Sequence, residues 1–294
     1  MTASAKPRCV AVGHLTHDRY GDKLAAGGSS LYAARVMQAL GADVAIVTSY
    51  GDDYEFLFEL QGIARFVTPS NTTTVFENTY PEGAPRSMLV EHPASIVRPD
   101  SLDPKWRHPT VLFLAPVIGE VKLDDWLQGS KDATTIIGLG LQGFLKQPEA
   151  SRHGGAGSPL RPKPFDPPGR LLNQVAAVFL SEEDLRGFAA PTLLDRLRRH
   201  VPIVSVSDGE NGATIYRKTE TFKVGIRPVP AVDPTGAGDT FAAGFLMGLA
   251  LGKPPKDAAR LGAAAASIIV QGVGPATLRM VEKAPNYTSD IPIY

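Results

Sequence analysis

The chain has 294 residues, of which 43% are hydrophobic and 20% charged, and its formal net charge is zero. This composition is that of a soluble globular protein, with enough residues for one large domain or two small ones. A neutral chain lacks the basic excess that nucleic-acid and membrane-surface binders need, so we predict neither kind of partner. No leader or membrane-spanning apolar run is evident, and we expect a cytoplasmic protein.

The first predicted elements alternate between strand and helix. Residues 9–13 form a short apolar run that ends at a glycine, which indicates a buried strand. Residues 27–41 follow with apolar residues at helical spacing and a glycine stop at Gly41, and residues 43–51 indicate a second buried strand. Strand, helix and strand joined by short links make a βαβ unit, so we predict a parallel sheet covered by helices.

The middle of the chain has a different character. Segment 65–92 is rich in threonine and aromatic residues and contains the turn-like run YPEGAP, which favours antiparallel strands. We expect this segment, together with residues 14–28, to form a lid over one end of the sheet. Segment 147–170 is rich in proline and glycine and has almost no aliphatic residues, so we predict a flexible loop there.

The strand and helix rhythm then resumes through the rest of the chain. Four apolar runs are predicted strands, at residues 110–117, 134–141, 175–181 and 202–207. Phe241, Phe245 and Leu249 recur at i, i+4 and i+8 and indicate the buried face of a helix that ends at Gly252. A second helix is expected over 255–271. The pattern predicts one layered α/β domain spanning residues 1–294.

The stretch AVDPTGAGDTFAAGF, residues 231–245, combines a loop of very small side chains with the start of a helix. Backbone N–H groups and the dipole at a helix N-terminus attract anions, and small residues let a phosphate approach the backbone. Asp239 follows one step into the helix, where it could accept a proton from a substrate hydroxyl attacking a phosphorus atom. The alternative is that Asp239 only stabilises the helix dipole.

This stretch resembles the C-terminal signature of the PfkB family, the ribokinase-like kinases of carbohydrates and nucleosides. The resemblance implies a three-layer α/β/α fold with a mostly parallel central sheet and a small antiparallel β lid. It also implies that Asp239 is the catalytic base and that Gly236, Ala237 and Gly238 form an anion hole. GLQGFLK, residues 140–146 in the run GLGLQGFLK, is similar to a segment of family members near the myo-inositol kinases.

Other segments resemble family motifs in the expected order. Asp18 matches an acid that binds substrate hydroxyls, and Gly27 and Gly28 match a glycine pair that lies against the substrate. SVSDGENGA, residues 205–213, resembles a segment that contacts the nucleotide. The resemblance assigns nucleotide contacts to four residues of this chain: Ser207, Gly209, Gly212 and Thr235.

The family pattern also implies cations, although this sequence departs from it. The family motif N-x-x-E, which organises Mg²⁺ and its waters, corresponds here to Ser181 and Asp184, with Glu183 as an alternative acid. Oxygen atoms of serine and aspartate can still hold a hydrated magnesium ion. Asp233 and Thr235 match positions that bind a monovalent cation in some members, which makes K⁺ a second candidate. Tyr32 stands where the family often has asparagine.

A competing motif is the run GLGLQG at residues 138–143, which fits the dinucleotide-binding pattern G-x-G-x-x-G. That fingerprint must open a helix, and here a Pro/Gly-rich segment follows within a few residues. We therefore do not predict NAD binding.

Together these features predict an ATP-dependent kinase that phosphorylates a hydroxyl of a sugar or polyol, with myo-inositol as the first candidate. A nucleoside kinase is the alternative, with Tyr32 or Phe144 available to stack on a base. A sugar-binding regulator without catalysis is a further alternative. The expected partners are the small-molecule substrate and ATP with Mg²⁺, and the expected oligomeric state is a monomer or a homodimer formed through the lid.

Overall fold

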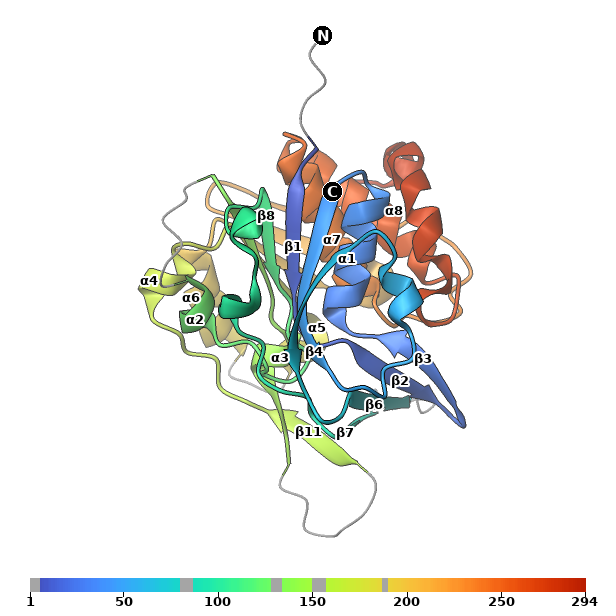
Figure 1. The fold of residues 1–294 in the computed structure, drawn as a ribbon. Helices are drawn as coiled ribbons and strands as arrows, with labels where there is room; N and C mark the ends of the chain where they lie inside the picture. The colour runs from blue at the N-terminus through green and yellow to red at the C-terminus, as the bar shows by residue number, and fades with distance from the viewer. Residues whose placement is uncertain (1–5, 80–86, 128–133, 150–156, 187–189) are drawn as a thin grey trace.

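Alternate residues of the first strand point into two different hydrophobic cores. In β1 (Arg8–Val12), Cys9 and Ala11 belong to one buried cluster, whereas Val10 and Val12 belong to another. Successive side chains of a strand point to opposite faces, so a strand that is apolar throughout must be covered on both sides. Helices cover both faces of this sheet (Figure 1), which confirms the predicted three-layer architecture. The computed structural model describes residues 6–79, 87–127, 134–149, 157–186 and 190–294.

The central sheet has nine strands. Their spatial order is β15 (Thr221–Val224), β14 (Ala213–Arg217), β13 (Ile203–Ser207), β12 (Ala177–Ser181), β9 (Ile136–Gly140), β8 (Val111–Leu114), β1, β4 (Asp43–Tyr50) and β5 (Ala64–Pro69). All neighbours run parallel except β13–β14 and β14–β15. The carboxyl ends of the seven parallel strands therefore meet at one edge, where open α/β sheets bind ligands.

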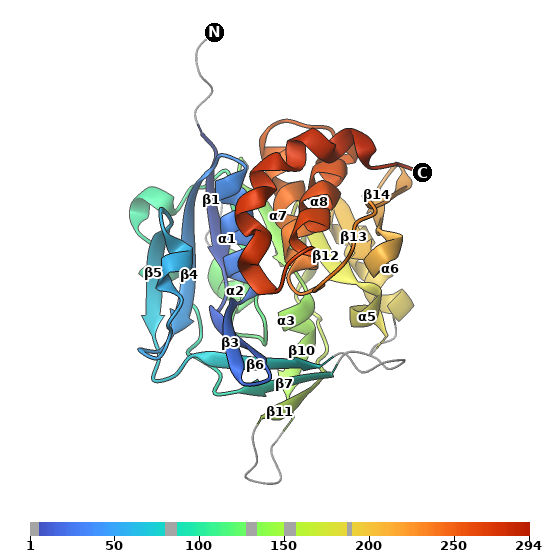
Figure 2. The same ribbon diagram turned by 90° about the vertical axis from the view of Figure 1, so that its right-hand side faces the viewer.

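The helices divide between the two faces. One face carries α1 (Ser29–Ala39), α7 (Ala237–Ala250), α8 (Pro255–Ile269) and the 3₁₀ segment η5 (Gly274–Asp290), which lie together in Figure 2. The other face carries α2 (Leu123–Leu127), α4 (Gly169–Leu172), α5 (Glu182–Leu185) and α6 (Ala190–His200).

The glycine stops predicted for two helices are confirmed. Gly41 has a φ of 94°, and the N–H groups of Gly41 and Ala42 donate to the carbonyls of Gln38 and Met37. Gly252, with a φ of 74°, ends α7 with two hydrogen bonds in the same pattern, from its own N–H and from the N–H of the next residue. This left-handed glycine cap satisfies carbonyls that the last helical turn leaves without partners.

A second sheet forms the lid below the carboxyl edge of the central sheet (Figure 2). Its spatial order is β10 (Lys146–Pro148), β11 (Ser158–Pro162), β7 (Ser87–Glu91), β6 (Thr74–Thr79), β2 (Thr16–Tyr20) and β3 (Lys23–Gly27). The pairs are antiparallel except β2–β6, which is parallel.

The lid differs from the prediction in two places. The start of segment 65–92 lies in β5, which pairs in parallel with β4 and belongs to the central sheet. The segment 147–170 is not simply a loop, because β11 within it pairs with both β10 and β7 and extends the lid. The backbone hydrogen bonds to β7 stabilise a strand here, which the proline- and glycine-rich composition of the segment does not predict.

No helix among the described residues is both long enough and apolar enough to cross a membrane.

Candidate active site

The loop before α7 packs closely against Tyr32 of α1. Gly236 is the N-cap and adopts the left-handed conformation, with φ 77° and ψ 0°. A Cβ atom at Gly236 would overlap the ring of Tyr32, whereas a Cβ at Gly238 would meet no protein atom within 4 Å. The fold therefore requires glycine at position 236 but not at 238. An exposed backbone without a side chain is the surface that a phosphate needs.

One of the predicted anion-hole groups is already occupied. The N–H of Ala237 donates to the carbonyl of Pro234 at 3.1 Å, so it points back into the loop. This differs from the expectation that Gly236, Ala237 and Gly238 act together. The remaining candidates are the N–H groups of Gly236 and Gly238, in the first turn where helical N–H groups have no intrahelical acceptor.

Asp233 holds this loop in place through hydrogen bonds. It is buried, and its carboxylate accepts hydrogen bonds from the Thr235 N–H at 2.8 Å, the Gly274 N–H at 3.0 Å and the Tyr20 hydroxyl at 2.8 Å. Burial raises the pKa of Asp233, but these donors more than offset that effect, so the pKa is lowered overall. Tyr20 belongs to lid strand β2 and was not anticipated from the sequence. Asp233 thus joins the lid, the glycine loop and η5.

Asp18 and Asp239 lie on the wall of one cavity beneath the lid. Asp18 is buried and its Oδ1 accepts a hydrogen bond from the Thr16 hydroxyl at 2.9 Å, while Asp239 is half-buried. The full lining comprises Thr16, Asp18, Gly28, Ser29, Tyr32, Phe76, Asn78, Met88, Val117, Gln142, Thr235, Gly236 and Asp239. The structure therefore brings together the predicted base, the predicted substrate acid and one member of the glycine pair.

Each member of the glycine pair is required by a close contact. A side chain at Gly27 would overlap the Asp18 carboxylate. Gly28 has a φ of 103°, and a side chain there would overlap the His14 carbonyl. The pair lets β3 pass directly over Asp18 and turn into α1, and so sets the position of the predicted substrate acid.

Glu120 is a site residue that the sequence did not reveal. It is only 2% exposed, and its carboxylate accepts hydrogen bonds from the N–H groups of His14, Val117 and Ile118 at 2.8–3.0 Å. Glu120 thereby fixes the loop that carries Val117 to the cavity wall.

A groove at the ends of β12 and β13 contains two of the four predicted nucleotide residues, Ser207 and Gly209, whereas Thr235 lines the cavity of Asp18 and Asp239 instead. It has a volume of about 240 Å³ and is lined by Ser181, Glu182, Glu183, Arg186, Ser207, Asp208 and Gly209. A side chain at Gly212 would overlap the Val224 carbonyl, so that glycine serves the packing of β15 against the loop. Gly209, with a φ of 52°, has open space around its Cβ position and remains a candidate for ligand contact.

Ser181 and Asp184 form a capping box at the start of α5. The Ser181 hydroxyl accepts from the Asp184 N–H, and Asp184 Oδ2 accepts from both the N–H and the hydroxyl of Ser181. Asp184 Oδ1 lies 3.5 Å from the ammonium of Lys146. Glu183 lines the same groove and is 44% exposed. These hard oxygen atoms fit a magnesium ion that keeps its own waters, with Glu183 more accessible than Asp184.

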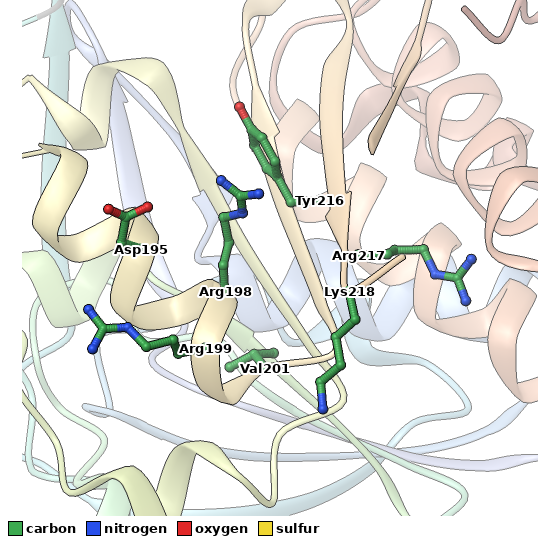
Figure 3. Close-up of a pocket in the computed structure, with 7 residues that line it drawn as sticks. All are labelled: Asp195, Arg198, Arg199, Val201, Tyr216, Arg217 and Lys218. Carbon is green, nitrogen blue, oxygen red and sulfur yellow. The ribbon is translucent and has the colours of Figure 1, made fainter. Parts of the chain in front are cut away.

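A larger hollow of about 520 Å³ lies at the opposite end of the sheet. It is lined by Asp195, Arg198, Arg199, Val201, Tyr216, Arg217 and Lys218, from α6 and the adjoining ends of β13 and β14. The side chains of Arg199, Arg217 and Lys218 point in different directions (Figure 3), and Arg217 pairs with Glu220. Val201 precedes β13 whereas Ser207 ends it, so this hollow is remote from the groove.

Comparison with known proteins points to one family. Residues 158–282 match the model of the pfkB family of carbohydrate kinases. The chain is 29% identical over 259 residues to an inositol 3-kinase of Oryza sativa subsp. japonica, which covers 84% of this chain and 63% of the relative. It is 27% identical over 256 residues to a cytidine kinase of Thermococcus kodakarensis, which covers 80% of this chain and 84% of the relative. The chain therefore spans less than two thirds of the length of the rice relative.

Solved structures agree on the fold. A pyrophosphate-dependent kinase in the ribokinase family, solved with a pyrophosphate analogue and myo-inositol, superposes with a TM-score of 0.77 at 19% identity. The superposition covers 94% of this chain and 99% of that chain. At this identity the likeness establishes the ribokinase fold.

Proposed function

We propose that this chain, whose residues 158–282 match the pfkB family model, is a carbohydrate kinase that transfers the terminal phosphoryl group of ATP to a hydroxyl of a sugar or polyol. The observation that carries the proposal is the shared cavity of Asp18 and Asp239 at the open N-terminal turn of α7. Asp18 orients the acceptor, and Asp239 removes the proton from the attacking hydroxyl. The N–H groups of Gly236 and Gly238 stabilise charge on the phosphoryl group.

In this proposal, ATP binds in the groove lined by Ser207 and Gly209. This groove lies at the same edge of the sheet as the cavity. Glu183, Asp184 and Ser181 would hold Mg²⁺ through its waters. When bound, the metal neutralises charge on the donor phosphates. K⁺ binding at Asp233 stays a prediction. Both oxygens of that carboxylate already accept hydrogen bonds, with which a cation would compete.

Burial of the candidate stacking rings favours a polyol over a nucleoside. Tyr32 is 1% exposed and its ring lies against Gly236, while Phe144 is 7% exposed and packs on Phe165 with ring centres 5.4 Å apart. This burial leaves little of either ring for a base to stack on. The inositol 3-kinase similarity supports myo-inositol as the first acceptor to test. The cytidine kinase similarity keeps a nucleoside as the second candidate.

A matrix of donors and acceptors tests the proposal. The donors are ATP and pyrophosphate, and the acceptors are pentoses, hexoses, inositols and nucleosides, each assayed by phosphorylated-product formation. We expect ATP-dependent phosphorylation of myo-inositol or a related polyol. Product formed only with nucleosides would replace the first acceptor class with the second. The absence of any product across the matrix would favour a sugar-binding regulator over a kinase.

A further inference from the structure

One cationic side chain lies between the acceptor cavity and the donor groove. Lys146 is the first residue of β10 and directly follows the short helix α3 (Gln142–Leu145). Figure 2 shows α3 and β10 between the central sheet and the lid. Its Nζ is 3.7 Å from the Sδ of Met88, a residue of the cavity wall. The same Nζ is 3.5 Å from Asp184 Oδ1 and 3.9 Å from Glu183 Oε1, on the groove side. Lys146 therefore contacts residues on both sides.

The ammonium is held loosely where it stands. The side chain of Lys146 is 17% exposed, so most of it is removed from water. Its distances to Asp184 and Glu183 exceed the 2.7–2.9 Å of a well-formed charge-assisted hydrogen bond. A lysine ammonium is a compact charge on a flexible stem. It can therefore turn toward a phosphate that enters the groove without a change in the backbone.

Phosphoryl transfer brings negative charge close to the position of Lys146. The phosphoryl group must travel from the groove to the cavity, and its three equatorial oxygens carry negative charge during the transfer. Cations that contact these oxygens stabilise the charge of the transition state in such reactions. Asp18, Asp239, Asp184 and Glu183 all add negative charge around the path. A positive group between the two hollows offsets part of that charge.

We propose that the Lys146 ammonium is a catalytic group that contacts the phosphoryl group in transit. This inference rests on the proposed kinase function and adds a residue to it. The bond between the donor's bridging oxygen and its terminal phosphorus breaks, and a bond from the acceptor oxygen to that phosphorus forms. Asp239 takes the hydroxyl proton, and Lys146 keeps its own proton throughout. Its contribution is the stabilisation of charge in the transition state.

The alternative is a structural role in which Lys146 only neutralises the capping-box acid Asp184 and its neighbour Glu183. A structural lysine would affect stability and leave the kinetics of the folded enzyme nearly unchanged. A catalytic one would lower kcat at an almost constant acceptor KM, because its interaction is made mainly in the transition state. The two roles therefore give different kinetic results.

The test starts from the donor and acceptor pair with which the wild-type protein is active, so a failed kinase assignment is recognised before any variant is made. The variants are Lys146→Met, Lys146→Arg and Lys146→Cys. Lys256→Met is the matched control, because Lys256 pairs with Glu220 at 3.1 Å on another part of the surface. We expect Lys146→Met to lose at least about 100-fold in kcat, Lys146→Arg to retain more activity, and Lys256→Met to behave as wild type.

Restoration of the charge makes the test independent of folding defects. Alkylation of Lys146→Cys with 2-bromoethylamine rebuilds an ammonium at nearly the same distance from the backbone. The native Cys9 is fully buried and burial raises its pKa to about 12, so it does not react under native conditions. We expect alkylation to restore at least about a tenth of the lost activity. Wild-type kcat in Lys146→Met, or no recovery on alkylation, would overturn the proposal.

Discussion

The ring of Tyr32 packs directly against the backbone of Gly236. A Cβ at Gly236 would lie only 2.7 Å from the Cζ atom of that ring, and Tyr32 is itself 1% exposed. Tyr32 occupies the position at which the family often has asparagine. The departure in α1 therefore has a structural use, because the aromatic ring fixes the loop from which α7 begins. Substitutions along this loop separate packing from ligand contact.

Gly236→Ala and Gly238→Ala are expected to differ in kind. Alanine at position 236 must adopt a positive φ and overlap Tyr32, so we expect a loss of at least about 2 kcal/mol in unfolding free energy. Alanine at position 238 meets no protein atom, so thermal stability should stay near that of wild type while kcat falls. Thermal denaturation and steady-state kinetics on both variants measure the contrast. Full activity in Gly238→Ala would show that no phosphate approaches that backbone.

Asp239→Asn tests the proton acceptor. The amide has nearly the same shape but cannot take the hydroxyl proton, so kcat should fall at least about 100-fold with little change in acceptor KM. Asp257→Asn is the matched control, because Asp257 is also an acid in the first turn of a helix, α8. Losing the dipole interaction and the ion pair with Arg260 there should cost only about 0.5–1.5 kcal/mol of stability. Equal kinetics in the two variants would leave Asp239 with a dipole role only.

Much of the fold could be predicted because its signals are local. The strands of the βαβ unit are apolar runs, and α1 and α7 end at Gly41 and Gly252, where a left-handed cap needs glycine. The assignment of β5 to the wrong sheet has a different origin. β5 lies at the start of a segment that is rich in threonine and aromatic residues, but its pairing with β4 is set by tertiary packing, which the local sequence does not reveal.

The candidate site was predictable to the same extent. The motif residues Asp18 and Asp239 reach one cavity as expected from the family resemblance. The contacts that support these residues join positions far apart in the sequence, so no local sequence pattern predicts them. Tyr20 and Asp233 are 213 residues apart in sequence, and Glu120 serves backbone groups from two separate loops. The N–H of Ala237 turns to Pro234 because the loop closes on itself, which no residue pattern reveals.

The Tyr20–Asp233 hydrogen bond is expected to couple the lid to the glycine loop. Tyr20→Phe removes the hydroxyl donor from a buried carboxylate and should cost about 1.5–3 kcal/mol of stability, the range for hydrogen bonds to charged groups. Because β2 also carries Asp18, we expect the acceptor KM to rise. In a double-mutant cycle with Asp233→Asn, the second substitution should cost less than it does alone. Strictly additive free energies would mean that the two side chains act independently.

Acid should destabilise the protein through His17. This ring is 3% exposed and stacks on Tyr54 with centres 5.4 Å apart. Burial lowers its pKa, and the charges of Asp53 and Glu55 offset this only in part. The native state therefore resists a proton that the unfolded chain accepts at a pKa of about 6.5.

The sign of this effect follows from proton linkage. As pH falls below about 6.5, the unfolded state binds more protons than the native state, so stability decreases toward pH 5 with a slope of at most about 1.4 kcal/mol per pH unit. His17→Phe keeps an aromatic ring against Tyr54 and removes the titrating group. We expect its Tm to fall less than that of the wild type between pH 7.5 and 5. Parallel Tm curves for the two proteins would assign the acid sensitivity to other groups.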